Sequence, residues 1–175
     1  YAGKEGEIVS GLVQRIERGN VYIDLGRAVG MMFYNETIPN EHYRIGERLR
    51  FYLLSLQEET SRLPGIILSR SHPKFVSKLF EMEVPEIQDG SVEIKSIARE
   101  AGSRTKIAVA SKIEGVDPVG SCVGQKGTRV NTITGGDRDE FDGLLLRKAS
   151  EHRLGVIMPF EVDTTLSFAE PAVKA

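Results

Sequence analysis

A glycine-x-x-glycine turn, Gly124-Gln125-Lys126-Gly127, has the residue types and spacing to bind an anion. Glycine lacks a Cβ, so two glycines three positions apart let the backbone turn sharply and come close to a ligand. Lys126 places a mobile positive charge inside the turn, and Thr128 directly after it fits the start of a helix. Because the first N–H groups of a helix have no intrahelical partner, this stretch predicts a binding site for phosphate.

The sequence around the turn makes this prediction more specific. Val92–Arg99 and Lys106–Ala110 alternate apolar and polar side chains, as strands do, and residues 101–103 fit a turn between them. Two short strands followed by two helices around a G-x-x-G loop resemble the bacterial (type II) form of the KH domain. In KH domains this loop clamps the backbone of about four nucleotides. The resemblance therefore implies that RNA phosphates are the anion.

Other kinds of site fit the sequence less well. A Walker A loop requires G-x-x-x-x-G-K-[S/T] after a buried strand, whereas Lys126 is followed by Gly127. The sequence shows no clustered carboxylates, no nucleophile beside a base and no zinc-ligand spacing, so we expect no catalytic residue, metal or cofactor. Asp117 before Pro118 is interpreted as a helix cap, and Cys122 as a packing residue. On the loop alone, an ordinary turn between two helices is the alternative.

The composition bounds the class of protein. The chain has 175 residues, of which 40% are hydrophobic and 27% charged, as expected for one large or two small globular domains. It has no signal peptide and no apolar run near the roughly 18 residues that a membrane-spanning helix needs. A single cysteine excludes an intramolecular disulfide framework and favours the reducing cytoplasm. Because the sequence begins with Tyr1, we expect it to be part of a longer protein.

The net charge of −2 is unusual for a nucleic-acid binder, but the charges are unevenly distributed. Residues 91–130 carry seven Lys or Arg against four Asp or Glu, whereas the segments on either side carry more acidic than basic side chains. The positive excess therefore falls on the segment that holds the G-x-x-G loop. The cations that we expect to contribute to binding are Arg99, Arg104, Lys106, Lys126 and Arg129.

The first 70 residues alternate apolar and polar side chains in five short segments, which predicts five strands. These segments are Glu7–Ile16, Val21–Leu25, Gly30–Tyr34, Glu47–Leu56 and Pro64–Ser69. So many short strands in so short a stretch favour a small closed barrel, since closure removes the exposed sheet edges. An oligonucleotide-binding (OB) barrel is the first choice, and an SH3-like barrel is compatible with the same pattern.

Motifs within this segment resemble the S1-type OB domain. They are Asn-Val-Tyr-Ile-Asp-Leu-Gly at 20–26, Val-Gly-Met-Met-Phe-Tyr-Asn-Glu at 29–36 and Leu-Ser-Arg-Ser at 68–71. In that family an aromatic residue on the second strand, a residue on the third and a basic residue after the fifth face the RNA. The resemblance implies this role for Tyr22, Phe33 and Arg70, and bases stack on aromatic faces without sequence readout. The alternative is that Phe33 or Tyr34 belongs to the barrel core.

An S1-type barrel followed directly by a KH domain is similar to the NusA family of bacterial transcription factors. The resemblance covers about residues 4–134, and its most specific part is Asp-Pro-Val-Gly-Ser-Cys-Val-Gly-Gln-Lys-Gly-Thr-Arg-Val at 117–130. It implies binding of nascent single-stranded RNA during transcription pausing, termination and antitermination, with RNA polymerase bound through other parts of the full-length protein. Alternatives are the RNA-binding part of an enzyme such as polynucleotide phosphorylase, which has the two domains in the opposite order, and a ribosome-associated protein.

These patterns predict an α+β chain in four parts. They are an S1-type barrel at 1–70, a helical connector at 71–84, a KH domain at 85–136 and a divergent tail at 137–175. The tail lacks the Gly-Glu-x-Ile-Asp-Ile-like strand that usually follows the loop helix in the family. Its pattern predicts a helix at Phe141–Leu154 and a strand-like segment at Gly155–Phe168. Val156–Phe160 could supply the missing strand, the tail could start a second KH domain, or residues could be absent from the numbering.

The sequence thus predicts a monomeric, non-catalytic RNA-binding protein of the cytoplasm, without membrane contact or cofactor. Two groups of residues are expected to bind the RNA strand, one in each domain. In the KH domain they are Val123, Gly124, Gln125, Lys126, Gly127, Arg129, Arg99, Arg104 and Lys106, and in the barrel they are Tyr22, Phe33 and Arg70.

Overall fold

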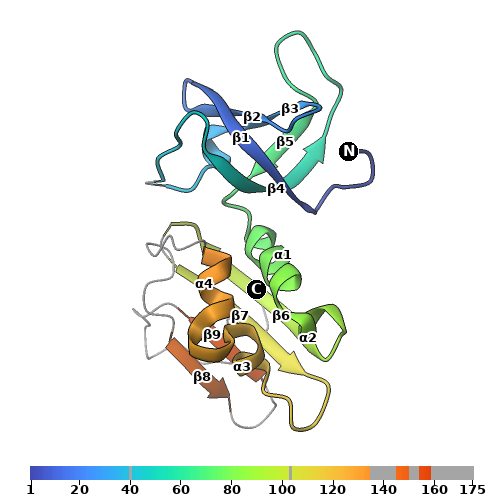
Figure 1. The fold of residues 1–175 in the computed structure, drawn as a ribbon, viewed down its shortest axis with the longest axis vertical. Helices are drawn as coiled ribbons and strands as arrows, with labels where there is room; N and C mark the ends of the chain where they lie inside the picture. The colour runs from blue at the N-terminus through green and yellow to red at the C-terminus, as the bar shows by residue number, and fades with distance from the viewer. Residues whose placement is uncertain (40, 103, 135–144, 150–153, 159–175) are drawn as a thin grey trace. The chain divides into compact units, whose positions relative to one another are not determined.

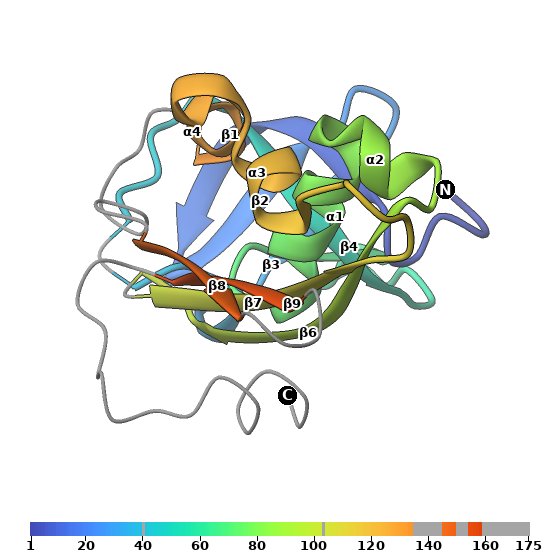
Figure 2. The ribbon, with the colours of Figure 1, turned by 90° about the horizontal axis from the view of Figure 1, so that it is seen from below.

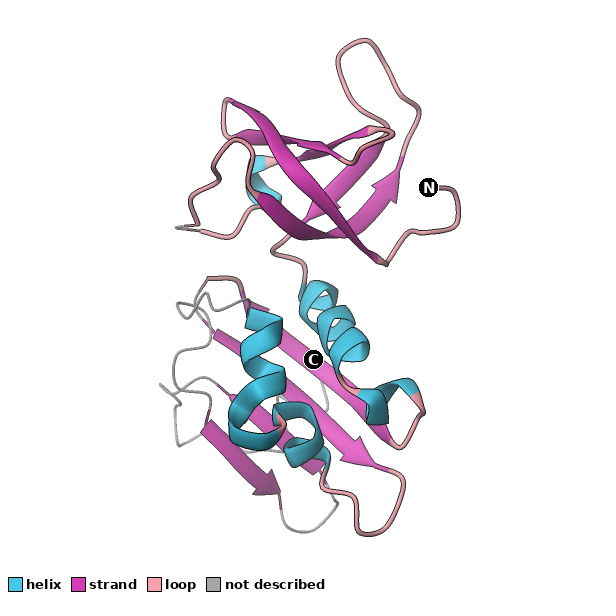
Figure 3. Ribbon diagram, in the orientation of Figure 1, coloured by secondary structure: helices cyan, strands magenta, loops and turns pink. Residues whose placement is uncertain are grey.

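The computed structural model describes residues 1–39, 41–102, 104–134, 145–149 and 154–158 of the chain. The chain divides into two compact units, Tyr1–Phe75 and Val76–Ala175. The first unit is built mainly from strands, and the second combines helices with strands (Figures 1 and 3). No helix within the described residues is long and apolar enough to cross a membrane.

Five strands form the first unit. They are β1 (Ile8–Glu17), β2 (Asn20–Asp24), β3 (Val29–Met32), β4 (Arg48–Leu56) and β5 (Ile66–Ser69). The strands close into a barrel in the order β1-β2-β3-β5-β4, in which the β3–β5 pair is parallel and the other pairs are antiparallel. The closed five-stranded barrel that the alternating pattern predicted is therefore confirmed.

The barrel interior is filled by one side-chain face of each strand. Because side chains alternate between the two faces of a strand, every second residue points inward. The buried core residues are Val13, Val21, Ile23, Met32, Phe51, Leu53, Ile66 and Leu68. Gly30 admits this packing, since a Cβ there would lie 2.7 Å from Leu68 Cδ1.

Strand β3 ends earlier than the sequence predicted. Instead of continuing to Tyr34, the chain leaves the sheet after Met32 and forms the 3₁₀ turn η1 (Tyr34–Glu36). The Asn20 side chain accepts a hydrogen bond from the Tyr34 N–H at 3.0 Å, and the Tyr34 carbonyl accepts from Thr37. These local bonds replace the ladder bonds that a longer strand would have made.

The second unit places helices on a four-stranded sheet. Its elements are α1 (Pro73–Glu83), α2 (Pro85–Gln88), β6 (Val92–Glu100), β7 (Arg104–Ser111), α3 (Pro118–Val123), η2 (Gln125–Gly127), α4 (Thr128–Thr134), β8 (Leu145–Ala149) and β9 (Leu154–Met158). The sheet order is β6-β7-β9-β8, and all its pairs are antiparallel. Helices α2, α3 and α4 lie on one face of this sheet (Figure 2). The predicted succession of two strands and two helices around the loop is confirmed.

The tail agrees with one of its predicted elements and differs from the other. Strand β9 pairs with β7, as the strand-like pattern from Gly155 and the alternative of a missing strand at Val156–Phe160 predicted. The apolar spacing of Phe141–Leu154 predicted a helix, but Leu145–Ala149 form strand β8 and Leu154 begins strand β9. Strand β9 pairs with β7 and β8 pairs with β9, so the open edge of β7 supplies backbone hydrogen bonds that override a weak helical pattern. Residues 141–144, 150–153 and 159–168 of the two predicted tail elements lie outside the described residues.

Candidate nucleic-acid interface

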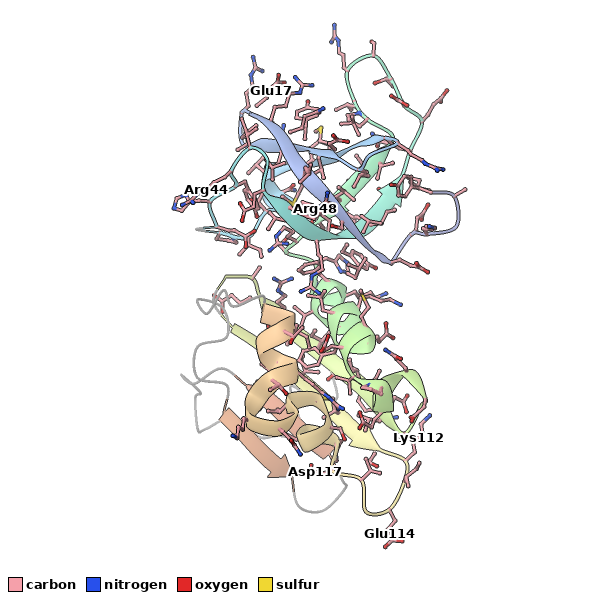
Figure 4. All side chains as sticks on the ribbon, viewed as in Figure 1. Glu17, Arg44, Arg48, Lys112, Glu114 and Asp117 are labelled. Atoms are coloured by element: carbon pink, nitrogen blue, oxygen red, sulfur yellow. The ribbon has the colours of Figure 1, made fainter. Side chains whose placement is uncertain are left out.

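Helix α3 carries the G-x-x-G loop and is fixed at both ends. At its start, the Asp117 carboxylate accepts a hydrogen bond from the Val119 N–H at 3.2 Å, and Pro118 occupies the first turn. Figure 4 shows Asp117 at this point, where the chain after β7 enters the helix. Val119 and Cys122 are buried, so α3 is anchored and presents its last residue, the half-buried Val123, to the loop.

The loop backbone has an unusual conformation that two glycines permit. Gly124 has φ 77° and ψ 171°, Gly127 has φ 75°, and Lys126 between them has φ 54° and ψ 27°. A left-handed conformation costs a non-glycine residue about 1–2 kcal/mol. Strained backbone of this kind is concentrated at sites with a function. The strained backbone at Lys126 therefore indicates that the lysine side chain has a function that outweighs its cost in folding stability.

The outer surface of the loop offers hydrogen-bond donors. Gln125 and Lys126 are exposed. Within the described part of the chain, the backbone N–H groups of these two residues donate to no protein acceptor and the Lys126 ammonium has no ion pair. By contrast, the Gly127 N–H is used internally, because it donates to the Gly124 carbonyl at 3.2 Å. Two N–H groups and one cation can therefore converge on an anion such as a phosphate.

Arg129 behaves differently from Lys126. One of its guanidinium nitrogens donates to the Glu86 carboxylate at 2.7 Å and to the Ser121 carbonyl at 2.5 Å, and the Arg129 side chain is 28% exposed. Its stem passes over Gly124, where a Cβ would lie 2.7 Å from Arg129 Cγ. The Arg129 guanidinium thus ties α4 to α2 and α3, and the predicted contact between Arg129 and RNA stays a prediction.

The other predicted cations of this unit lie on the sheet. Arg99 is on β6 and Lys106 on β7, where Ala98 is paired with Lys106 and Arg99 with Thr105. Both cationic side chains are half-buried and take part in further interactions. The side chain of Arg104 lies outside the described residues. Of the predicted KH residues, the structure thus brings 123–127 and Arg129 together at the loop.

Two of the three predicted residues of the barrel are covered. Tyr22 is only 8% exposed, and the Arg15 guanidinium lies 4.0 Å above its ring. The Arg70 side chain is 13% exposed and donates to both oxygens of Glu41, at 2.7 and 3.1 Å, and to a backbone carbonyl on β4 at 2.6 Å. Phe33, the third, is half-buried just after β3. Tyr22 and Arg70 are therefore packed in the protein and do not present free faces to a ligand.

Two residues that were not predicted to bind RNA are prominent in the structure. Tyr34 was considered only as a core alternative, yet it is 69% exposed. Two adjacent aromatic residues cannot both face the core of one strand, so the pair Phe33-Tyr34 was the signal for an exposed ring. Glu86 was not considered, and its pairing with Arg129, 43 residues further along the chain, has no local signature.

The thiol of Cys122, just before the loop, is buried and has a shifted pKa. Burial raises the pKa of the Cys122 thiol to about 12, the Glu86 carboxylate adds to the rise, and the Arg129 guanidinium opposes it. A thiol with so high a pKa is protonated at neutral pH and is a poor nucleophile. No group of three or more His, Cys, Asp or Glu among the described residues could hold a metal ion.

Comparison with known proteins identifies both units. Residues 3–71 match the S1 RNA binding domain, and residues 70–140 match the NusA-like first KH domain. Two relatives named transcription termination/antitermination protein NusA, from Halalkalibacterium halodurans and Bacillus subtilis, are 47% identical over 133 residues, which is 76% of this chain. The NusA of Thermus thermophilus is 41% identical over 150 residues, or 85% of this chain. The chain spans 35%, 36% and 38% of the lengths of these three relatives, respectively.

Proposed function

The chain belongs to the NusA family over the S1 and first KH domains that it shares with these relatives, and we propose that it binds nascent single-stranded RNA. In the proposed role the bound RNA is the transcript behind an elongating polymerase, and binding modulates pausing, termination and antitermination. The name shared by the relatives, transcription termination/antitermination protein, supports this role. The chain acts as a binding module without a catalytic residue.

The observation that carries this proposal is the geometry of the 124–127 loop. Two glycines and a strained lysine turn the backbone sharply at an exposed Gln125-Lys126 pair, and among the described residues no backbone acceptor pairs with the N–H groups of these two residues. Backbone N–H groups in a turn of this kind form a concave site for anions. An RNA backbone supplies a phosphate at every nucleotide, so such a site binds the strand without reading its sequence.

Arg129 acts as a positioning residue in this scheme. Its guanidinium is engaged with Glu86 and the Ser121 carbonyl, so it holds α4 against α2 and α3. The outward direction of the loop depends on this arrangement, since Gly124 packs directly on the Arg129 stem. Lys126 then supplies the direct charge contact with RNA, and Arg129 acts through the shape of the loop.

Partners beyond RNA follow from the family. RNA polymerase is the proposed protein partner, bound through other parts of a longer protein, since this chain spans 35–38% of the lengths of these relatives. The chain acts as a monomer in the bacterial cytoplasm, where transcription takes place. Its two units both contribute to binding the transcript.

Binding to labelled RNA tests the proposal. Fluorescence anisotropy is measured as the 175-residue chain is added to an unstructured RNA and to a duplex of the same sequence. We expect the single strand to bind more tightly than the duplex. The slope of log K against log salt concentration should be roughly −0.7 for each phosphate neutralised. Incubation with magnesium should leave the RNA intact. Absence of binding, or binding that ignores salt, would contradict the proposal.

A further inference from the structure

Tyr34 presents an aromatic ring to solvent on the barrel. At 69% it is far more exposed than Tyr1, the other exposed aromatic residue among those described, at 41%. A single exposed apolar side chain is common and does not by itself indicate a site. What distinguishes Tyr34 is that its backbone is held rigidly while its ring is free.

Three hydrogen bonds hold the Tyr34 backbone. Its N–H donates to the Asn20 side chain at 3.0 Å, and its carbonyl accepts from the Thr37 N–H at 3.2 Å and the Thr37 hydroxyl at 2.5 Å. On the opposite side Gly19 lies so close that a Cβ there would be 3.2 Å from Tyr34 Cβ. An aromatic ring on a fixed backbone loses little entropy when it binds, which favours a stacking partner.

The surroundings of Tyr34 are polar and carry a cation. Arg18 precedes Gly19 in the turn between β1 and β2, is exposed, and has no ion pair among the described residues. Arg15 nearby is paired with Glu17, which Figure 4 shows at this end of β1. Arg18 is therefore the cation of this turn that is available to an anionic ligand.

One flat ring beside a cation matches the chemistry of an unpaired nucleotide. A base stacks on the ring while its phosphate is attracted by the arginine. A protein partner would instead require a contiguous apolar patch. Asn35, Asn20 and Arg18, next to Tyr34 in the chain and across the turn, are polar, and the preceding Phe33 is half-buried.

We propose that Tyr34 is a stacking platform for one unpaired RNA base, with Arg18 beside it attracting the phosphate. This inference rests on the proposed RNA-binding function and specifies where the barrel contributes to it. It also replaces Tyr22 in that role, since the Tyr22 ring lies beneath Arg15. The exposed tyrosine of η1, and not the tyrosine of β2, is the aromatic surface that this barrel offers to RNA.

A tryptophan at this position provides a direct test. The chain contains no tryptophan, so Tyr34→Trp introduces a single indole at the proposed stacking site. Ile45→Trp places the same reporter at a 74% exposed position of the barrel as a matched control. RNA should quench the indole of Tyr34→Trp at the concentrations that saturate anisotropy, because a stacked base quenches indole emission, and it should leave the indole of Ile45→Trp nearly unchanged.

Affinity provides the second readout. Tyr34→Ala should weaken RNA binding roughly fivefold or more, whereas Tyr34→Phe should bind as the parent chain does. The stacking site would be overturned if the parent chain binds RNA normally but RNA leaves the Tyr34→Trp emission unquenched and Tyr34→Ala binds with unchanged affinity. The proposed function would then stay intact. Failure of the parent chain to bind RNA would instead contradict the proposed function itself.

Discussion

The two candidate RNA surfaces of this protein are built from different parts of the chain. The loop of the second unit is defined by backbone, because Gly124, Lys126 and Gly127 have positive φ and, among the described residues, no backbone acceptor pairs with the N–H groups of Gln125 and Lys126. The surface of the barrel is defined by side chains, and there Arg15 covers Tyr22. The backbone site takes its conformation from glycines within the loop itself, whereas a side-chain site depends on every neighbour that can cover it.

The largest expected effect is the unfolding of one unit by a core mutation that leaves the other unit folded. Phe51 is fully buried in the barrel core, so Phe51→Ala should destabilise the barrel by about 3–5 kcal/mol. If the units fold independently, the second unit should keep its structure. Unfolding of the second unit can be followed through Cys122, the only cysteine in the chain. Its thiol is buried in the folded unit and has a pKa raised to about 12. Labelling of Cys122 at pH 8 by a thiol reagent should stay slow in Phe51→Ala.

A variant of the second unit serves as the matched control. Ile107 is 1% exposed on β7, and Ile107→Ala should destabilise that unit by about 2–5 kcal/mol. In Ile107→Ala, Cys122 should react faster with the thiol reagent while the barrel stays folded. The unfolding transition of the barrel is identified in the thermal melt as the one that Phe51→Ala removes, and it should be present in Ile107→Ala. Fast labelling of Cys122 in Phe51→Ala would show that the units unfold together, and the comparison between them would not hold.

The next effect concerns charge at the loop. Replacing Gln125 and Lys126 together by Asp places two carboxylates where a phosphate should bind, and unit charges near 4 Å repel by about 1 kcal/mol even in water. Together with the lost lysine attraction, this should weaken RNA binding tenfold or more, as measured by anisotropy. The melt should barely change, because both side chains are exposed.

The control for this variant carries the same change in charge on the barrel. Lys4→Asp combined with Gln14→Asp alters two exposed positions outside both candidate surfaces. Its affinity should fall much less than that of the loop variant. If both variants lost RNA affinity equally, the cause would be the change in net charge, and the loop would not be a specific RNA-binding site.

A smaller effect distinguishes the direct contact from the positioning residue. Lys126→Met should reduce the slope of log K against log salt by roughly 0.7, the contribution of one phosphate on a single strand. Arg129→Met should lower the affinity but leave the slope unchanged, because the Arg129 guanidinium is occupied by Glu86. A reduced slope in Arg129→Met would make Arg129 a phosphate contact after all.

The smallest effect compares backbone strain in the two units. Arg18 in the barrel and Lys126 in the loop are the two non-glycine residues with positive φ among those described, at 53° and 54°. Changing either to Gly relieves about 1–2 kcal/mol of strain but adds about 0.4–1 kcal/mol of unfolded-state entropy. Each variant should therefore be slightly more stable in urea titration. A marked loss of stability in either would show that the side chain, and not the backbone, determines the conformation there.

The same difference explains how much the sequence could predict. The G-x-x-G spacing located the loop because the conformations of Gly124 and Gly127 are local requirements. The alternating pattern located the five barrel strands, since burial of one face is also a local property. The covering of Tyr22 and the pairing of Arg70 with Glu41 could not be predicted, because they depend on contacts between residues distant in the chain.

The tail gives the opposite lesson about local patterns. The spacing of Phe141–Leu154 is helical, but the strands β8 and β9 form because the edge of β7 can accept a further strand. A short apolar segment fits either structure, and the sheet determines which one forms. Local reasoning therefore succeeded where the chain folds on itself and was wrong where a distant strand supplied the hydrogen bonds.

Mapping of the backbone amides by NMR measures directly whether the 124–127 loop binds RNA. In a ¹⁵N-labelled chain titrated with single-stranded RNA, we expect the amide signals of Gln125, Lys126 and Gly127 to shift, with saturation at the concentrations that saturate anisotropy. The N–H groups of Gln125 and Lys126 should shift most, because no backbone acceptor among the described residues pairs with them, whereas the Gly127 N–H donates to the Gly124 carbonyl. Saturable RNA binding that leaves these three amides unchanged would contradict the account.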